Sequence, residues 1–483
     1  MGRFLMRKEI SFWFLTTALI FNAAFHSLNA QSAYEELKKS AETEVTPPVP
    51  NPSPVLKAGE YGPSSKARKD WKEASALYSS KNFSAGSEQK FDLEGNSAVI
   101  LQGFHWYADN YWFHPPGGWW GVLAGKAGEV GEAGFDFIWF PPVSRGSYYP
   151  TEWYDLDSQW GKKEKLLEAV QAMKTAGVRP IADIILNHRN GTKDWADFTS
   201  PDWPTTAVVK DDEWQSPMKS QNYDEGQGDW GCRDLDHKNE QVREDAKIFL
   251  RWLRYTIGFE GWRYDMVKGY QPGRVSEYNS ASSPSFSVGE YYDTNRQLLV
   301  SWVDGTSGAS TVFDFTTRYN LVAAVESERY DLLNDGGKPS GVIGWWPAKA
   351  VTFVENHDTS PRDENFITNA PAEYKTQRLM GYAYILTHPG TPSVFWPHFF
   401  DWGAAYKAKI QALIDLRKSA GITASSPVQV LAGQNELYAA MITGNGKYLV
   451  LKLGKNWGWE PGKGWKMETS GERYAVWSQD IRK

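Results

Sequence analysis

Eight short apolar runs, each bounded by turn residues, recur along most of this chain. Runs of this length between turn signals are typical of buried β-strands. The runs are Ala98–Phe104, Phe135–Pro141, Val178–Leu186, Gly261–Val267, Ser285–Glu290, Ser310–Phe315, Ala350–Asp358 and Thr391–Trp396. Their number and spacing limit the fold strongly, because strands that alternate with helices form a parallel sheet.

Helical patterns lie between several of these runs. One apolar stripe stops at Gly177, a natural helix terminator, and consists of Leu166, Leu167, Val170 and Met173. A second stripe, just ahead of the fourth run, consists of Val242, Ala246, Phe249, Leu253 and Ile257. Eight βα units predict a closed (β/α)₈ TIM barrel at residues 91–420. An open, doubly wound α/β sheet is the alternative, but no glycine-rich phosphate loop follows the first run.

Two segments interrupt or follow the repeating pattern. Residues 189–237 are rich in Asp, Gly, Trp and Pro and separate the third run from the next helix. A loop of that length is usually functional or a subdomain of its own, and we expect an inserted subdomain. A helical segment at 404–420 precedes alternating runs separated by turn residues. This pattern predicts a small antiparallel β domain at 421–483.

The N-terminal residues 1–30 have the layout of a secretory signal peptide. Basic residues precede an apolar stretch at 11–25, which at about 15 residues is short for a membrane span. An uncleaved anchor is the alternative. Residues 31–90 include a proline-rich stretch at 46–54, which favours extended, solvated chain. We therefore predict a secreted or periplasmic protein, free of the membrane after signal removal, with a disordered linker at 31–90.

Composition excludes some classes of function. A net charge of −6 gives no support for nucleic-acid binding. The single cysteine, Cys232, excludes an intramolecular disulfide framework, and a buried thiol is its ordinary interpretation. The 24 Trp and 24 Tyr residues could serve in part to stack on sugar rings, although core packing must account for most of them.

Polar residues, most of them ionisable, stand at the carboxyl ends of four runs. Parallel-strand folds collect their chemistry at this end, because the loops there converge. The residues concerned are Asn187 and His188 after the third run, Asp265 in the fourth, Glu290 in the fifth, and His357 and Asp358 in the seventh. We expect these side chains to share one site.

Asp265 and Glu290 differ in the environment that the sequence predicts for them. Arg263 shares a strand face with Asp265, and a nearby positive charge favours an ionised carboxylate, which suits a nucleophile. Taken alone, this pair would be interpreted as a buried structural ion pair. Glu290 ends an apolar run, where partial desolvation should raise the pKa of its carboxyl group, as a general acid requires.

Together these segments resemble the sequence blocks of the α-amylase family of retaining glycoside hydrolases, most closely the plant-type enzymes. The resemblance runs from about Ile100 to the C-terminus and includes the stretches 101–104, 181–184, 313–317, 344–350 and 381–390. It implies a (β/α)₈ barrel with a subdomain inserted after strand three and a C-terminal antiparallel β-sandwich. That layout agrees with the organisation predicted above.

The resemblance also implies roles for individual residues. Asp265 matches the nucleophile, Glu290 the general acid/base, and Asp358 the third carboxylate, which binds sugar hydroxyls and helps distort the ring. The implied substrate-binding residues are His188 and His357 at the sugar hydroxyls, Tyr148 as a stacking platform, Lys268 on the leaving-group side, and Arg263 beside the nucleophile. For each histidine a satisfied core residue is the alternative, but both stand at strand ends beside acidic residues.

A structural calcium ion between the barrel and the inserted subdomain is a further implication of the resemblance. Its ligands map onto Asn187, Asp224, Asp234 and the carbonyl groups of Gln227 and Gly269, which are the hard oxygen donors that Ca²⁺ requires. A solvated acidic loop is the alternative. Gly228 stands where plant relatives have a further acidic ligand, so we predict one calcium ion only.

Trp345 and Trp346 stand between Gly344 and Pro347, which indicates a turn leading into the seventh run. That end of a barrel is remote from the catalytic face. The resemblance implies a secondary starch-binding site at this pair, and packing beneath the barrel is the alternative.

Three hypotheses of function remain. The first is a secreted, monomeric, endo-acting α-amylase that hydrolyses internal α-1,4 bonds of starch. The second is an exo-acting maltosidase or a transglycosylase of the same family. The third is a non-catalytic glucan-binding protein on the same scaffold, which the presence of all three carboxylates opposes.

Overall fold

The computed structural model describes residues 63–84, 91–109, 117–193, 195–228, 231–456 and 458–481. The predicted signal peptide at 1–30 and the proline-rich stretch at 46–54 lie outside these residues. Within the described part of the chain, no helix combines the length and the apolar character that a membrane span needs.

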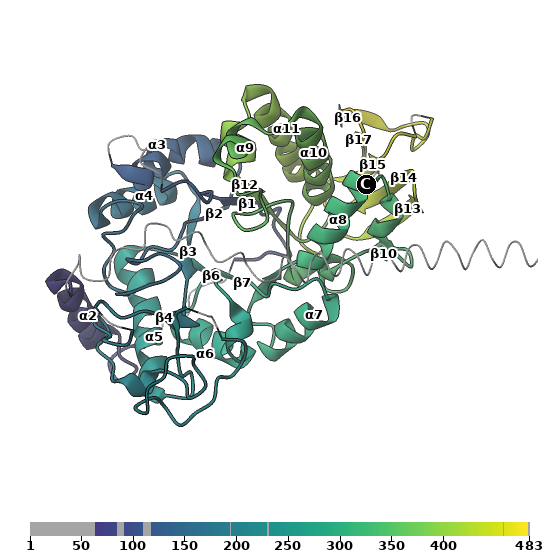
Figure 1. Cartoon of the computed structure of the whole chain (residues 1–483). Helices are drawn as coiled ribbons and strands as arrows, with labels where there is room; N and C mark the ends of the chain where they lie inside the picture. The colour runs from purple at the N-terminus through teal and green to yellow at the C-terminus, as the bar shows by residue number, and fades with distance from the viewer. Residues whose placement is uncertain are drawn as a thin grey trace, which may run out of the picture. The chain divides into compact units, whose positions relative to one another are not determined.

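Eight parallel strands close into a barrel (Figure 1), and each strand lies within one of the eight predicted runs. In chain order they are β1 (Ile100–Gln102), β2 (Phe137–Trp139), β3 (Arg179–Ile184), β6 (Gly261–Tyr264), β7 (Phe286–Gly289), β8 (Thr311–Phe313), β11 (Ala350–Phe353) and β12 (Thr391–Phe395). Strand β1 pairs with both β2 and β12, which closes the ring. The predicted (β/α)₈ barrel is confirmed, and an open sheet is excluded.

Helices follow the barrel strands and cover the outside of the ring (Figure 1). They are α3 (Gly118–Glu132), α4 (Lys163–Thr175), α5 (Glu240–Trp252), α6 (Pro272–Ser282), α7 (Arg296–Gly305), α8 (Phe315–Ser327), α9 (Glu364–Asn369), α10 (Ala372–Thr387) and α11 (Ala404–Ala420). The apolar stripe predicted ahead of the fourth run is buried, in α5 and in the turn that follows it, whereas Leu167 of the α4 stripe is exposed. The Asn239 side chain caps α5 by accepting from Gln241 N, which satisfies one of the unpaired N–H groups of the first turn.

The segment inserted between β3 and α5 contains little regular structure. It forms β4 (His188–Arg189), η2 (Thr205–Ala207) and β5 (Arg233–Asp234), and β4 pairs antiparallel with β5. The remaining short elements of the barrel domain are η3 (Leu253–Ile257), η4 (Val267–Gly269), η5 (Tyr330–Leu333), β9 (Asn334–Asp335), β10 (Lys338–Pro339), η6 (Val342–Gly344), η7 (Pro347–Lys349) and η8 (Pro397–Asp401).

The C-terminal domain is antiparallel, as predicted, but its described strands form one sheet rather than a two-sheet sandwich. In spatial order they are β13 (Val428–Gln434), β14 (Leu437–Thr443), β15 (Lys447–Leu453), β17 (Tyr474–Asp480) and β16 (Lys466–Ser470). Strand β15 packs against α10 and α11. An antiparallel sheet with one apolar face must bury that face. Here α10 and α11 of the barrel domain cover it, in place of a second sheet.

A packed helix lies where the sequence analysis expected a disordered linker. Helix α2 (Ser65–Tyr78) lies beside α5 (Figure 1), with Ala67 and Ala74 buried against the barrel domain. Trp71 and Tyr78 pack on the same side. The prediction that nothing is packed before about residue 90 is therefore wrong, because these four residues form a narrow apolar stripe within an otherwise charged helix.

Candidate active site

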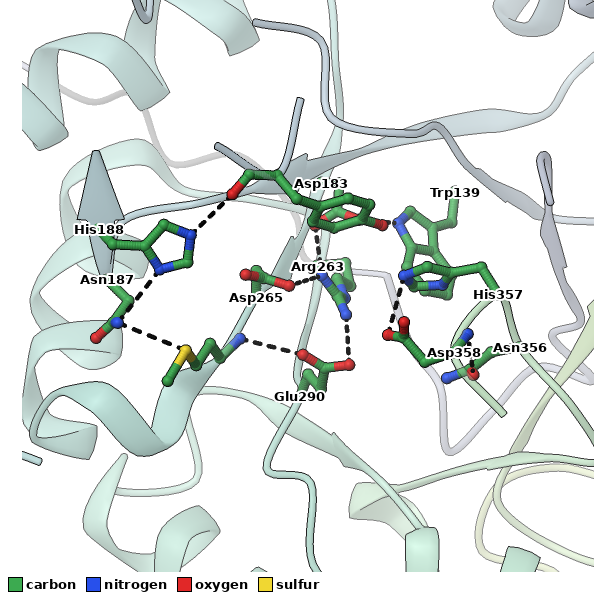
Figure 2. A network of polar contacts seen from close by, with 12 residues as sticks. Trp139, Asp183, Asn187, His188, Arg263, Asp265, Glu290, Asn356, His357 and Asp358 are labelled. Atoms are coloured by element: carbon green, nitrogen blue, oxygen red, sulfur yellow. Dashed lines mark hydrogen bonds and ion pairs between the residues drawn. The ribbon is translucent and has the colours of Figure 1, made fainter. Parts of the chain in front are cut away.

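The carboxylates singled out from the sequence meet at the carboxyl end of the barrel (Figure 2). Asp265 directly follows β6, and Glu290 directly follows β7. Backbone bonds extend the strand pairing to both residues, with Asp265 N donating to Ile184 O at 3.0 Å and Glu290 N donating to Tyr264 O at 2.9 Å. The strand ends therefore fix the backbone at both residues.

Arg263 binds three carboxylates with one guanidinium group. Its Nη1 lies 2.5 Å from Asp265 Oδ1 and 2.7 Å from Asp183 Oδ1. Its Nη2 lies 2.6 Å from Glu290 Oε1. Arg263 is completely buried, so these contacts act in a medium of low polarity. Three carboxylates thus converge on a single positive charge.

The pKa shifts separate the roles of these carboxyl groups. Burial raises the pKa of Glu290 well above its ordinary value, and repulsion from Asp265 and Asp358 acts in the same direction, against Arg263. This confirms the direction predicted from the sequence. Burial, aided by Asp265, also raises the pKa of Asp183 to about 6. Burial therefore favours the protonated form of Glu290, as a general acid requires.

Asp358 is held in the opposite state by positive neighbours. Gln102 Nε2 donates to His357 Nδ1 at 3.0 Å, which leaves the Nε2–H of His357 to face Asp358 Oδ2 at 3.1 Å. Arg362 lies 3.2 Å from the other oxygen of Asp358. Burial opposes the charged form, but His357 and the arginines outweigh it, so the pKa of Asp358 lies well below its ordinary value.

Tyr148 forms a wall of the site. Its ring stacks on His357 at a centroid distance of 5.2 Å and an interplanar angle of 8°, and Trp106 stacks nearby at 6.1 Å and 13°. The Tyr148 hydroxyl donates to Asp183 Oδ2 at 2.9 Å, and the Tyr148 carbonyl accepts from His188 Nε2 at 2.8 Å. The predicted platform is thus fixed at both ends. The other predicted contact, Lys268, lies 2.8 Å from Asp293.

The residues assigned to calcium come from separate segments that meet beside β4 and β5. Asn187 Nδ2 lies 3.4 Å from Asp234 Oδ1, and a Cβ atom added to Gly269 would overlap the Asn187 amide. A Cβ atom on Gly228 would overlap Asp234 Oδ2 and would lie 3.7 Å from Asp224 Oδ2. Gln227 adjoins Gly269, because its N–H donates to Lys268 O at 2.9 Å.

One buried oxygen in this group fits a cation. Asp224 Oδ2 is buried and has no hydrogen-bond partner among the described residues, and burial raises the pKa of Asp224. An oxygen in that position is costly unless it is paired. The donors are carboxylate, amide and carbonyl oxygens, which suit Ca²⁺. The residues present therefore fit the ion that the sequence predicted.

A second acidic group lies close by. Carboxylate oxygens of Asp212, Glu213 and Asp234 lie within 4.8 Å of one another. However, Arg233 contacts Asp212 at 2.5 Å and Glu213 at 2.7 Å, so a guanidinium group already pairs with two of these three carboxyl groups. The Asp224 side is the better cation site.

Trp345 and Trp346 lie between η6 and η7, in the turn that leads into β11, as predicted. Their surroundings differ, because Trp345 is 48% exposed whereas Trp346 packs against the core. The guanidinium carbon of Arg296 lies 3.7 Å from the Trp345 ring centroid, so one face of that ring is covered. The two rings therefore do not form one exposed platform, and packing, the alternative interpretation, applies to Trp346.

Two family models match this chain. The model described as "Alpha amylase, catalytic domain" matches residues 116–396, more than half of the chain. This chain belongs to the α-amylase family. The model described as "Alpha-amylase C-terminal beta-sheet domain" matches residues 419–478. The chain is accordingly an enzyme of this family, and the catalytic match contains all the carboxylates described above.

Named relatives of this family member come from plants and bacteria. "Probable alpha-amylase 2" of Arabidopsis thaliana is 38% identical over 78% of this chain and 93% of its own length. "Alpha-amylase 3, chloroplastic" of the same plant is 35% identical, and the match covers 44% of that protein. A "Glucan 1,4-alpha-maltotetraohydrolase" of Roseateles saccharophilus is 31% identical over 74% of this chain and 68% of its own length.

Solved structures of other family members share the fold. The crystal structure of an Anoxybacillus α-amylase superposes with a TM-score of 0.62 at 16% identity, over 80% of this chain and 98% of that one. The α-amylase of Geobacillus thermoleovorans, solved with acarbose, gives a TM-score of 0.61 at 16% identity, over 80% and 99% of the two chains.

Sequence reasoning missed several residues of this α-amylase site. Asp183 binds Arg263, Tyr148 and Trp139, whose Nε1 donates to Asp183 Oδ2 at 3.0 Å. Gln102 orients His357, and Trp106 extends the aromatic wall. One signal was available, because Asp183 is the only charged residue inside the apolar run 180–186 and a buried charge needs a partner.

Proposed function

We propose that this family member is an endo-acting α-amylase that hydrolyses internal α-1,4-glucosidic bonds of starch with retention of configuration. The observation that carries the proposal is the Arg263 fork, which holds Asp265 and Glu290 on the two nitrogens of one guanidinium group. Retaining glycosidases keep their two carboxyl groups only roughly 5–5.5 Å apart, and one shared fork favours such a short separation.

The proposed reaction uses the two carboxyl groups in sequence. Glu290 donates its proton to the glycosidic oxygen as that bond breaks, and Asp265 attacks the anomeric carbon to form a covalent glycosyl–enzyme. Glu290, now ionised, accepts a proton from water, which attacks the same carbon and releases Asp265. Asp358 and His357 bind hydroxyl groups of the distorted sugar, with His188 and Lys268 at its edges.

The experiment that tests this proposal compares iodine staining of soluble starch with the release of reducing sugar. Endo cleavage destroys the stain long before much reducing sugar appears. The matched variants Asp265→Asn and Glu290→Gln should remove nearly all turnover, since proton transfer alone contributes ~10²–10⁴-fold. Either variant that keeps a tenth of wild-type turnover with an unchanged melting curve would refute the assigned roles.

A second candidate is exo action with a fixed product length, and one observation favours it. A bacterial relative that is 31% identical is named a glucan 1,4-alpha-maltotetraohydrolase. In that case the iodine stain would persist while a single short oligosaccharide accumulates. The same assay therefore separates the two candidates.

Calcium, starch binding at the exposed ring of Trp345, and secretion complete the proposal. The unpaired oxygen of Asp224 supports a calcium ion held by Asn187, Asp224, Asp234 and the carbonyls of Gln227 and Gly269. When bound, the ion would join the β4–β5 segment to the loop after β6.

The signal-peptide layout of residues 1–30 supports secretion. Mass spectrometry of secreted protein should then find a mature N-terminus near Gln31.

A further inference from the structure

Helix α2 lies ahead of the residues that the catalytic-domain model matches, yet it is bound to the barrel domain along its length. Asp70 forms an ion pair with Lys163 of α4 at 2.5 Å, with both side chains largely buried. At the other end of the helix, the Tyr78 hydroxyl lies 2.9 Å from Thr256 Oγ1, and Arg251 Nη1 donates to Tyr78 O at 2.7 Å. The helix is therefore a fixed part of the domain.

The N-cap residue of α2, Ser64, binds the buried carboxylate of Glu152. Ser64 caps α2, and its backbone N–H points at Glu152, with distances of 3.3 and 3.2 Å to the two carboxylate oxygens. Glu152 is 0% exposed. Its other partners are Arg145 at 3.1 Å and the Thr199 hydroxyl at 3.0 Å. The positive end of the helix dipole adds to the attraction for this anion.

Glu152 belongs to the loop between β2 and α4 that carries Tyr148. Arg145 and Glu152 form an isolated β-bridge across the base of this turn, so the ion pair closes the loop. At its tip, Ser147 has a φ of 54°, a left-handed conformation that costs free energy for a residue with a Cβ atom. Such a conformation persists only where the surroundings impose it. Ser147 directly precedes Tyr148.

We propose that α2 positions the sugar-stacking wall of the active site, acting through Glu152. The positioning contacts begin with the Ser64 N–H on the Glu152 carboxylate, which in turn binds Arg145. From Arg145 the loop backbone continues through Ser147 at the tip to Tyr148. Tyr148 in turn stacks on His357 and binds Asp183 and His188. Glu152 is a positioning residue, because it touches neither the reacting atoms nor the sugar. The role in catalysis rests on the proposed α-amylase activity.

The backbone at Ser64 allows a clean test in the full-length chain. Its φ of −74° suits proline, so Ser64→Pro removes the N–H group that Glu152 accepts while keeping the local conformation. Ser64→Ala is the matched control, because it loses the capping hydroxyl but keeps the N–H group. Glu152→Gln, in which the acceptor keeps its shape but loses its charge, is a second variant.

We expect Ser64→Pro and Glu152→Gln to lose about tenfold in kcat/KM on a short maltooligosaccharide, because a misplaced positioning group costs this much or more. Ser64→Ala should stay within about twofold of wild type. The assay runs well below the melting temperature of each variant, so that a loss of stability alone leaves kcat/KM unchanged. Wild-type activity in the same assay tests the proposed function separately.

Hydrogen exchange gives a readout that needs no activity. Backbone amides of residues 145–149 and of Thr151 should exchange faster in Ser64→Pro than in Ser64→Ala, because the anchor of the loop is weakened. Wild-type kcat/KM together with wild-type exchange in Ser64→Pro would overturn the proposal. Equal losses in Ser64→Pro and Ser64→Ala would also overturn it, since the N–H group would then not be the link.

Discussion

At Arg263, one positive charge contacts three carboxyl groups, and they cannot all be ionised at low cost in a buried site. Burial and mutual repulsion accordingly raise the pKa of two of them, Glu290 and Asp183, whereas Asp358, which lies on His357 and Arg362 instead, is stabilised in its charged form. For Arg263 itself, burial is outweighed by the carboxylates, so its pKa lies above its ordinary value. In the proposed reaction, Glu290 and Asp265 on this guanidinium group serve as the acid and the nucleophile.

We predict that Asp183→Asn is strongly destabilising. The change removes one partner of a buried ion pair, which costs on the order of 3 kcal/mol, and it weakens the acceptor of the Tyr148 hydroxyl. Urea unfolding should show this loss, and kcat should fall. Asp293→Asn is the control, since its ion pair with Lys268 is partly exposed and worth about 1 kcal/mol or less. Equal stabilities of the two variants would contradict the prediction.

We predict that Glu290 makes the folded enzyme less stable as pH rises. Its pKa is raised in the folded state, so the folded chain binds more protons than the unfolded chain between the two pKa values, and stability falls with pH in that window. Glu290→Gln lacks this effect. The free energy of unfolding of Glu290→Gln relative to wild type should therefore increase from about pH 4.5 toward neutrality. A difference independent of pH would count against the raised pKa.

The candidate active site shows which of its residues could be predicted from the sequence and which could not. Asp265, Glu290 and Asp358 were found because each ends a run of apolar residues at the face where loops converge. Asp183 was missed because it stands inside a run, where its role depends on the cross-strand register that pairs it with Arg263. That register cannot be read from one segment alone.

At the scale of elements, η6 and η7 present the two tryptophans differently. Trp345 is exposed and has one ring face against Arg296, which itself binds Asp335 at 2.5 Å. Trp346 packs against the core. The free face of Trp345 is thus the part of the pair suited to stack on a glucan.

We predict that Trp345→Ala and Trp346→Ala differ in their effects. Trp345→Ala should weaken adsorption to starch granules about fivefold, the equivalent of ~1 kcal/mol for one stacked ring, with an unchanged melting temperature. Trp346→Ala should mainly lower stability through lost packing. Hydrolysis of short soluble oligosaccharides, measured in parallel, should stay nearly unchanged in Trp345→Ala. An equal loss on granules and on short substrates would show that Trp345 is not a separate binding surface.

Helix α2 was not predicted, although its sequence carries a helical pattern. Its apolar residues Ala67, Trp71, Ala74 and Tyr78 recur at helical spacing, and Ser64 is a favourable cap. The signal was present but weak, because two of the four are alanines and the flanking chain is rich in proline. The barrel strands, in contrast, lie in mainly apolar runs bounded by turn residues, so each could be found on its own.

At the scale of the whole molecule, the inserted segment and the barrel are joined at the proposed calcium site. Asn187 follows β3, Asp234 lies in β5, and Gly269 follows β6, so one ion would tie together parts far apart in sequence. The segment itself has little regular structure to stabilise it. Its order should therefore depend on the ion.

We predict that calcium raises the melting temperature of the enzyme. A ligand that binds only the folded state adds about 2.7 kcal/mol at a hundred times its Kd, and magnesium should substitute poorly. Calorimetry after EDTA treatment, with and without added calcium, measures the effect. Asp224→Asn should abolish the response, whereas Glu213→Gln, a change in the neighbouring acidic cluster, should keep it. A melting temperature that does not change after exhaustive chelation would refute the proposed calcium site.

The closure of the barrel through β1 and β12 also sets the order in which the chain can fold. Strand β1 ends at Gln102, and its partner β12 begins at Thr391, so the ring cannot close until most of the polypeptide has left the ribosome. Contacts between such distant segments carry a large entropic cost and slow folding. A nascent chain of this design stays open for a long time. Until the ring closes, the edges of the growing sheet stay unpaired, which favours aggregation of the incomplete barrel.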